Sequence, residues 1–208
     1  MDDQSCCSDA ESITSFDGYE HFPDLVRLIA HGEPLEVADL ATAVGLPVAE
    51  VEAMLRAQPG TDWDERGRLV GFGLTLRPTP HRFSVSGRTL YTWCAADAFL
   101  FTFILGEPAV AESTCPVTGE EIRVALSPEE VTAVAPPEAV ISERLGPGLG
   151  ADLRAEVCDH GHFFSSREVA ASWAAGAHQG GEVRSVTEAF ERARATCEAL
   201  GWLAGGRA

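Results

Sequence analysis

Apolar residues recur at helical spacing through the first third of the chain. Leu25, Leu28 and Ile29 fall on one face of a first predicted helix, because positions three and four apart share a face. The same pattern continues beyond it. The predicted helices are Tyr19–Ala30, Pro34–Ala41 and Val48–Gln58. A Gly45-Leu46-Pro47 turn separates the last two, and two short helices around a glycine turn are typical of a helix-turn-helix.

The segment after these helices changes to a strand pattern. Trp63 and an Arg66-Gly67 turn come first, and the runs Leu69–Leu76 and His81–Val85 then predict two strands. Strands that follow a helix-turn-helix can form its wing. The sequence therefore predicts a winged-helix-like unit over residues 18–80.

Residues 81–208 have a different pattern of predicted secondary structure, in which short strands alternate with helices. The predicted strands are Ala109–Ser113, Glu121–Leu126, Val131–Val134, Val140–Glu143 and Val183–Ser185. The predicted helices are Trp93–Leu105, Arg167–Ala175 and Val186–Leu200. Pro136-Pro137 and Gly146-Pro147-Gly148 interrupt the pattern as turns. We expect an α+β fold, in which residues 81–208 form a core of small antiparallel sheets with helices.

The charge of the chain limits its partners. The net charge is −17, and all 15 basic residues are arginines. Residues 1–80 carry 15 acidic and 5 basic side chains, a net of −10. Phosphate contacts supply much of the affinity for DNA, so we expect the predicted winged helix to be structural and the protein to bind no nucleic acid. Such a surface also repels anionic membranes, and the longest apolar run, Ala98–Leu105, is far shorter than the ~20 residues that span a bilayer.

Residues 1–17 are polar and acidic and predict a mobile tail. They show no signal-peptide pattern, so we expect a cytoplasmic protein. Cysteines normally stay reduced there, and we read all six of them as thiols: Cys6, Cys7, Cys94, Cys115, Cys158 and Cys197. The Cys6-Cys7 pair could capture soft metals, and Cys197 is expected in the core.

The run Trp93-Cys94-Ala95-Ala96-Asp97 is the first candidate site. On a helix, the thiol of Cys94 and the carboxyl of Asp97 would share a face. If Thr92 capped that helix, Cys94 would lie in its first turn, where the helix dipole favours a thiolate. Apolar surroundings would raise the pKa of Asp97 above its usual value of ~3.9. The alternative is that Cys94 is a small core residue.

The run from Val157 to Phe164 is the second candidate. If it is extended, Cys158, His160 and His162 project from one face and could bind zinc or copper. The alternative is a lone thiol beside hydrogen-bonded histidines. The run Cys115-Pro116-Val117-Thr118-Gly119 is better explained by a tight hairpin with a packed cysteine than by half of a zinc site.

Several of these runs together resemble the alkylmercury lyases of mercury-resistant bacteria. The resemblance covers roughly residues 20–200, with motifs in the same order and at similar spacing. The matching runs are Gly71-Phe72-Gly73-Leu74-Thr75-Leu76-Arg77, Leu90-Tyr91-Thr92-Trp93-Cys94-Ala95-Ala96-Asp97, Cys115-Pro116-Val117-Thr118-Gly119 and Cys158-Asp159-His160-Gly161-His162-Phe163-Phe164-Ser165, with Trp173. The chain departs from the pattern at Asp159, where some members have a second adjacent cysteine.

The resemblance implies cleavage of a carbon–mercury bond by protonation of the carbon. It implies an active site of Cys94, Asp97 and Cys158, with product Hg(II) bound by the same residues, and a structural role for Cys115. Thiolates are soft ligands suited to mercury, and protonation of the leaving carbon requires a general acid. We expect an organomercurial substrate, a thiol co-reactant, no organic cofactor, and mercuric reductase as the recipient of Hg(II). The alternatives are a metal-responsive winged-helix regulator and a zinc- or copper-binding protein.

Overall fold

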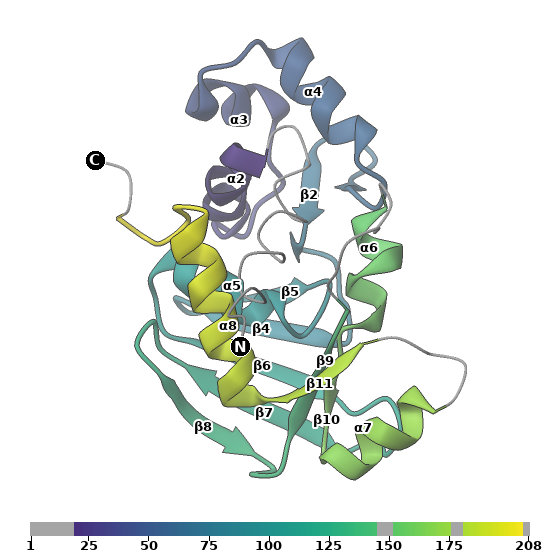
Figure 1. Ribbon diagram of the computed structural model, residues 1–208. Helices are drawn as coiled ribbons and strands as arrows, with labels where there is room; N and C mark the ends of the chain where they lie inside the picture. Colours follow the sequence, from purple (N-terminus) through teal and green to yellow (C-terminus); the bar gives the residue numbers. More distant parts are fainter. Residues whose placement is uncertain (1–18, 145–151, 176–180, 206–208) are drawn as a thin grey trace, which may run out of the picture.

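The computed structural model describes residues 19–144, 152–175 and 181–205 (Figure 1). Its helices are η1 (Tyr19–His21), α2 (Phe22–Ile29), α3 (Val37–Val44), α4 (Val48–Ala57), α5 (Asp97–Leu105), α6 (Leu153–Glu156), η2 (Cys158–His160), α7 (Arg167–Ala174) and α8 (Val186–Ala199), where η marks a 3₁₀-helix. The predicted tail, with Cys6 and Cys7, lies outside the described residues. Within the described part of the chain, no helix has the length and apolar character required to cross a membrane.

The strands form two antiparallel sheets. They are β1 (Asp62–Trp63), β2 (Leu69–Phe72), β3 (Leu74–Thr75), β4 (His81–Val85), β5 (Arg88–Thr92), β6 (Ala109–Thr114), β7 (Glu121–Leu126), β8 (Val131–Ala135), β9 (Val140–Glu143), β10 (Phe163–Phe164) and β11 (Glu182–Ser185). The larger sheet has the order β1-β2-β3-β5-β4-β6-β7-β8, and the smaller has the order β10-β9-β11. The α+β class predicted from the sequence is confirmed.

The helix-turn-helix forms where the apolar spacing predicts it. Gly45 ends α3 in the left-handed conformation, with φ of 73°, which glycine adopts without steric cost. Its N–H donates to the carbonyl of Ala41 at 2.9 Å. Pro47 then precedes α4, and Val51 and Leu55 of that helix are buried. Helices α2, α3 and α4 gather at one end of the molecule, away from most of the larger sheet (Figure 1).

Of the two strands predicted for the wing, one is wrong and one is confirmed. The run Leu69–Leu76 is not one strand, because Gly73 has φ of 72° and folds it into the antiparallel pair β2 and β3. The strand His81–Val85 exists, but it pairs with β5 and β6 rather than with β2 or β3. Strand β3 pairs with β5 as well, so one sheet runs through both parts of the chain. The division at residues 80 and 81 stays a prediction.

Helix α5 is buried in the core of the molecule, and its first residue, Asp97, belongs to the candidate site. It is apolar on nearly all sides, and Phe99, Phe101 and Ile104 are fully buried, as expected for a core helix. Phe190 of α8 packs against it, with ring centroids 6.2 Å from Phe99 and 4.8 Å from Phe103. These contacts hold the first residue of α5 in a fixed place inside the fold.

Candidate active site

Cys94 lies in the turn between β5 and α5. The N–H of Trp93 donates to the carbonyl of Gly73 at 2.8 Å, and the hydroxyl of Thr92 donates to the carbonyl of Cys94 at 2.7 Å. Helix α5 begins only at Asp97, with Ala96 as its N-cap. The predicted helix start at Trp93 and the predicted capping role of Thr92 are therefore wrong. Cys94 precedes the helix, so it does not lie in the first turn, where the helix dipole would favour its thiolate.

The carboxyl of Asp97 is hydrogen-bonded to the backbone of Cys94. The N–H of Cys94 donates to Oδ2 of Asp97 at 3.0 Å. The carboxyl is buried, with 8% of the residue exposed, because the apolar helix that it begins fills the core. Burial raises the pKa of Asp97 to about 6, against the opposing effect of hydrogen bonds from the backbone and thiol of Cys94 and the backbone of Trp93. The predicted rise in its pKa is confirmed.

Cys158 reaches the same place from a distant part of the chain. It begins η2, directly after α6, and it is buried. The carbonyl of Gly161 accepts a hydrogen bond of 3.0 Å from the N–H of Ala95, which joins the two cysteine-bearing turns. A Cβ at Gly161 would lie 2.8 Å from Cβ of Cys94. A side chain at position 161 would therefore push the two turns apart.

The thiols of Cys94 and Cys158 and a carboxyl oxygen of Asp97 all lie within 4.8 Å of one another. Among residues 19–144, 152–175 and 181–205, these three side chains form the only such group suited to holding a metal ion. The hydrogen bond between the thiols, burial and the carboxyl of Asp97 raise the pKa of Cys94 well above its ordinary value. The pKa of Cys158 is also raised: its hydrogen bond with Cys94 lowers it, but burial and the nearby carboxyls outweigh that effect.

The predicted zinc or copper site at Cys158, His160 and His162 is not formed. The segment is helical at Cys158–His160 rather than extended. Nε2 of His160 lies 2.9 Å from Nη1 of Arg144, and Nε2 of His162 lies 3.1 Å from the carbonyl of Asp159. Each histidine thus uses a ring nitrogen for a protein contact. The histidines are hydrogen-bonded, as the alternative interpretation predicts. The thiol of Cys158 is not alone, however, because the thiol of Cys94 lies beside it.

A cavity of about 100 Å³ opens beside the three groups, and all of them line it. Its apolar wall includes the aromatic rings of Phe22, Phe72, Trp93 and Trp202. The rings of Phe22 and Trp202 lie 5.1 Å apart, so segments from opposite ends of the chain close one side. The arrangement can hold a small apolar group next to two thiols and one carboxyl.

The remaining described cysteines lie away from this cavity. Cys115 is buried in the β6–β7 turn, where its N–H donates to the carbonyl of Glu120 at 2.8 Å and its carbonyl accepts from Gly119 at 3.0 Å. The predicted tight hairpin with a packed cysteine is confirmed. Cys197 is fully buried in α8, as expected from its place in the last helix.

Comparison of the sequence with models of known protein families shows which family the chain belongs to. The sequence model of the alkylmercury lyase family matches residues 74–198, and that of the helix-turn-helix domain of alkylmercury lyase matches residues 20–73. The chain belongs to the alkylmercury lyase family. Alkylmercury lyases from Bacillus cereus and Pseudomonas putida are 43% and 42% identical to it, over 83% and 87% of this chain and 78% and 86% of their own.

The fold of this alkylmercury lyase family member has a solved counterpart. MerB2, solved in a mercury-bound form, matches with a TM-score of 0.75 at 22% identity, over 91% of this chain and 95% of its own. The shared fold covers the helix-turn-helix and the core together. The two family matches meet at residues 73 and 74, at the tight turn between β2 and β3.

Sequence reasoning missed the residues that hold the cysteine segments in place. Asp62, Arg154 and Gly161 are absent from the predicted site, and α6 is absent from the predicted helices. Gly161 offered a signal, since a glycine between two histidines near a candidate cysteine suggests a close backbone approach. Asp62 and Arg154 offered none, because their ion pair joins residues 92 positions apart.

Proposed function

We propose that this enzyme cleaves the carbon–mercury bond of organomercurials, with Cys94 and Cys158 as mercury ligands and Asp97 as the proton carrier. The convergence of two buried thiols and a buried carboxyl within 4.8 Å carries the proposal. Membership of the alkylmercury lyase family supports it. The products are a hydrocarbon and Hg(II), and the biological purpose is detoxification of organomercury.

The two thiols suit the capture of mercury. Thiolates are the softest common protein ligands, and mercury is a soft metal. A zinc–sulfur bond measures about 2.3 Å, so two sulfurs less than 4.8 Å apart can bind one metal ion with little movement. Two sulfur ligands on mercury donate electron density toward the bound carbon and weaken its bond to the metal.

Proton transfer follows from the pKa values of the free site. The raised pKa of Cys94 keeps its proton on sulfur, and the pKa of Asp97 of about 6 leaves the carboxyl ionised at neutral pH but able to hold a proton. When mercury binds the sulfur, the proton moves to Asp97, which returns it to the departing carbon.

The reaction balances without an oxidant or reductant. An organomercury thiolate and two cysteine thiols give the hydrocarbon, Hg(II) bound by two cysteine thiolates, and the released thiol. One cysteine proton goes to carbon and the other to the leaving thiolate. The aromatic wall of the cavity receives the organic group, and the scheme uses no organic cofactor.

Release of Hg(II) requires competing thiols. We propose that an external thiol serves as co-reactant and that mercuric reductase receives the ion through its own cysteines. Reduced thiols are abundant in the cytoplasm, which is the compartment that this scheme requires.

The two alternative functions have less support. A DNA-binding regulator conflicts with the charge of −10 over residues 1–80, and helix α4 presents Glu50 and Glu52 against the single Arg56. A zinc- or copper-binding role at the histidines conflicts with the protein contacts of His160 and His162.

One assay tests the proposed function. The full-length protein is incubated with phenylmercury and excess thiol, and benzene is measured by gas chromatography. We expect repeated turnover. Absence of benzene above the rate with thiol alone would refute the proposal.

A further inference from the structure

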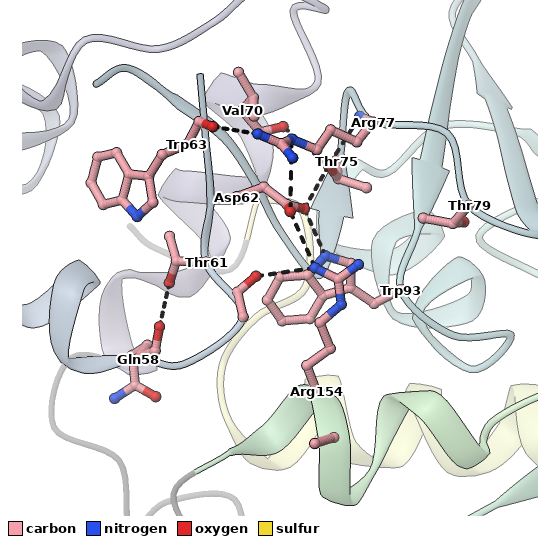
Figure 2. Close-up of polar contacts among 12 residues, drawn as sticks. Gln58, Thr61, Asp62, Trp63, Val70, Thr75, Arg77, Thr79, Trp93 and Arg154 are labelled. Carbon is pink, nitrogen blue, oxygen red and sulfur yellow. Dashed lines mark hydrogen bonds and ion pairs between the residues drawn. The ribbon is translucent and has the colours of Figure 1, made fainter. Parts of the chain in front are cut away.

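Asp62 carries a buried carboxyl in the helix-turn-helix part of the chain, with 7% of the residue exposed. Its Oδ2 accepts hydrogen bonds from the hydroxyl of Thr75 at 2.9 Å and from the indole Nε1 of Trp93 at 3.1 Å. Its Oδ1 accepts from Nη1 of Arg154 at 3.1 Å. Figure 2 shows these side chains pointing toward the carboxyl from three different segments. One carboxyl thus joins β1, the β5–α5 turn and α6.

Two of these partners lie next to the reactive cysteines in the sequence. Trp93 directly precedes Cys94, and Arg154 lies in α6, one turn before Cys158. The guanidinium of Arg154 also lies over the ring of Trp93, 4.8 Å from its centroid (Figure 2). The contacts of Asp62 therefore act on the backbone segments that carry the two sulfurs.

The stem of Arg154 is held closely as well. Its Nη1 donates to the carbonyl of Gly60 at 3.2 Å. A Cβ at Gly60 would lie 2.9 Å from Cβ of Arg154, so the glycine permits α6 to approach the β1 segment. Trp93, Leu153 and Val157 all line the cavity beside the site, and small movements of α6 would change the shape of that cavity.

We propose that Asp62 is a positioning residue for carbon–mercury cleavage, which sets the distance between the Cys94 and Cys158 segments through Trp93 and Arg154. This inference rests on the proposed function. It gives the helix-turn-helix part a role that requires no DNA: this part supplies the carboxyl that aligns the two thiols. Asp62 itself touches neither sulfur, and it acts only through its partners.

The segments that carry Cys94 and Cys158 are also connected without Asp62, which indicates that Asp62 does more than stabilise the fold. The hydrogen bond from Ala95 to Gly161 still joins the two turns when Asp62 is absent. Loss of Asp62 is therefore expected to loosen the pair of sulfurs rather than to disassemble the site. Misplacement of reacting groups by about 1 Å can slow a reaction about a hundredfold, so the rate is expected to respond strongly to this loosening.

The experiment compares Asp62→Ala with Asp64→Ala as a matched control. Asp64 also accepts several hydrogen bonds, from the backbone of Arg66 at 2.9 Å and from the backbone and Nε of Arg68 at 2.8 Å each. These contacts stay within one hairpin and touch neither cysteine segment. Benzene release from phenylmercury gives kcat and KM, and thermal unfolding gives the folded fraction to which each rate is normalised.

For Asp62→Ala we expect a fall in kcat of about tenfold or more, with KM changed less than about threefold. We also expect the Hg(II)-loaded variant to lose its metal to a competing dithiol at a concentration about tenfold lower than the wild type. The Asp64→Ala variant is expected to match the wild type in both measurements. A purely structural carboxyl would change the folded fraction and leave both normalised values unchanged.

Arg154→Met provides the second variant, because it keeps the aliphatic stem against Gly60 and loses the ion pair. We expect it to show the same fall in kcat, and the double variant to be no slower than the slower single variant, since both changes break one connection. If Asp62→Ala does not fold, the Arg154→Met variant alone tests the positioning role. Normal kcat and normal mercury retention in either folded variant would overturn the positioning role. Absence of benzene from the wild type would instead refute the proposed function.

Discussion

The backbone N–H of Cys94 donates a hydrogen bond of 3.0 Å to Oδ2 of Asp97, which ties the carboxyl to the residue whose thiol loses a proton in the proposed mechanism. The bond runs across a turn rather than along a helix, since α5 begins at Asp97. It holds the carboxyl beside the sulfur, at the wall of a cavity that is lined by aromatic rings. This geometry supports the proposal that Asp97 carries one proton from sulfur to carbon.

Replacement of Asp97 by asparagine is expected to abolish turnover and leave mercury binding nearly intact. The amide oxygen can still accept the hydrogen bond from Cys94, and both thiols remain, but the proton carrier is lost. Benzene release measures turnover, and equilibrium dialysis against Hg(II) measures binding. A rate above about a tenth of the wild type, equivalent to ~1.4 kcal/mol of barrier, would count against Asp97 as the acid.

Asp159→Asn is the control for that substitution. Asp159 is exposed and adjacent to Cys158, but its carboxyl lies outside the group formed by the two thiols and Asp97. The control variant removes the same charge at a neighbouring position. We expect it to cleave phenylmercury within about twofold of the wild type, because surface charges act weakly through water.

Stability should depend on pH through Asp97 in a defined direction. Its pKa is raised from 3.8 to about 6 in the folded protein, so the fold keeps a proton that the unfolded chain releases. Asp97 therefore stabilises the fold below about pH 4, and this contribution is lost as the pH rises through 6. At pH 7.5 we expect Asp97→Asn to be more stable than the wild type, by up to about 3 kcal/mol. Denaturant unfolding of both proteins at pH 4.5 and 7.5 measures this difference, which should shrink at the lower pH.

The sequence predicts which residues meet at the candidate site better than it predicts their local structure. The run of aromatic residues after Asp97 made its burial predictable, and the matching motifs pointed to Cys94 and Cys158. The spacing of Cys94 and Asp97 fits a helical face, yet their contact is formed by a turn, because Thr92 donates to the carbonyl of Cys94 and delays the helix. The spacing of apolar residues gives no sign that a side chain will take up a backbone carbonyl and so delay the start of a helix.

Two of the strand predictions failed for a related reason. The apolar run Leu69–Leu76 contains Gly73, whose left-handed conformation turns one expected strand into two. The Cys158–His162 segment has the period of a strand, but its backbone closes the hydrogen bonds His160 to Val157 and Gly161 to Cys158, at 3.1 and 3.0 Å. The buried ion pair of Asp62 and Arg154 depends on the folded chain as a whole, and no local pattern predicts it.

Cys115→Ser is expected to act on stability. The thiol is buried, with 1% of the residue exposed, and replacement of its sulfur by the smaller oxygen loses packing contacts, which costs roughly 1–3 kcal/mol. Thermal unfolding should show a melting temperature lower by about 3–8 °C. The rate of cleavage per folded molecule should stay within about twofold of the wild type. A loss of turnover in fully folded protein would assign Cys115 to the chemistry instead.

The isolated protein is expected not to bind duplex DNA at moderate salt. The −10 charge of residues 1–80 repels phosphates, and neutralisation of phosphates by Lys and Arg supplies much of the affinity for DNA. An electrophoretic mobility shift assay at low and moderate salt measures this, with a known winged-helix protein as the positive control. A salt-sensitive shift by the protein would favour the regulator.

Single serine substitutions at Cys94 and Cys158 are each expected to remove cleavage. An alcohol is a poor ligand for a soft metal and does not ionise at neutral pH, so neither variant can hold mercury between two protein sulfurs beside Asp97. Both residues are buried in turns joined by the Ala95–Gly161 hydrogen bond, and serine fits either position with little change in volume. Cys197→Ser, in a buried helix position away from the cavity, is the matched control and should retain turnover per folded molecule.

X-ray absorption at the mercury edge of the product complex then distinguishes the possible ligands. The wild type should show two sulfur neighbours, with an oxygen further out where Asp97 lies. Each serine variant at Cys94 or Cys158 should show one protein sulfur, with the second supplied by added thiol. Nitrogen neighbours from His160 and His162, or normal turnover by Cys158→Ser, would show that the reaction does not require mercury bound between the sulfurs of Cys94 and Cys158.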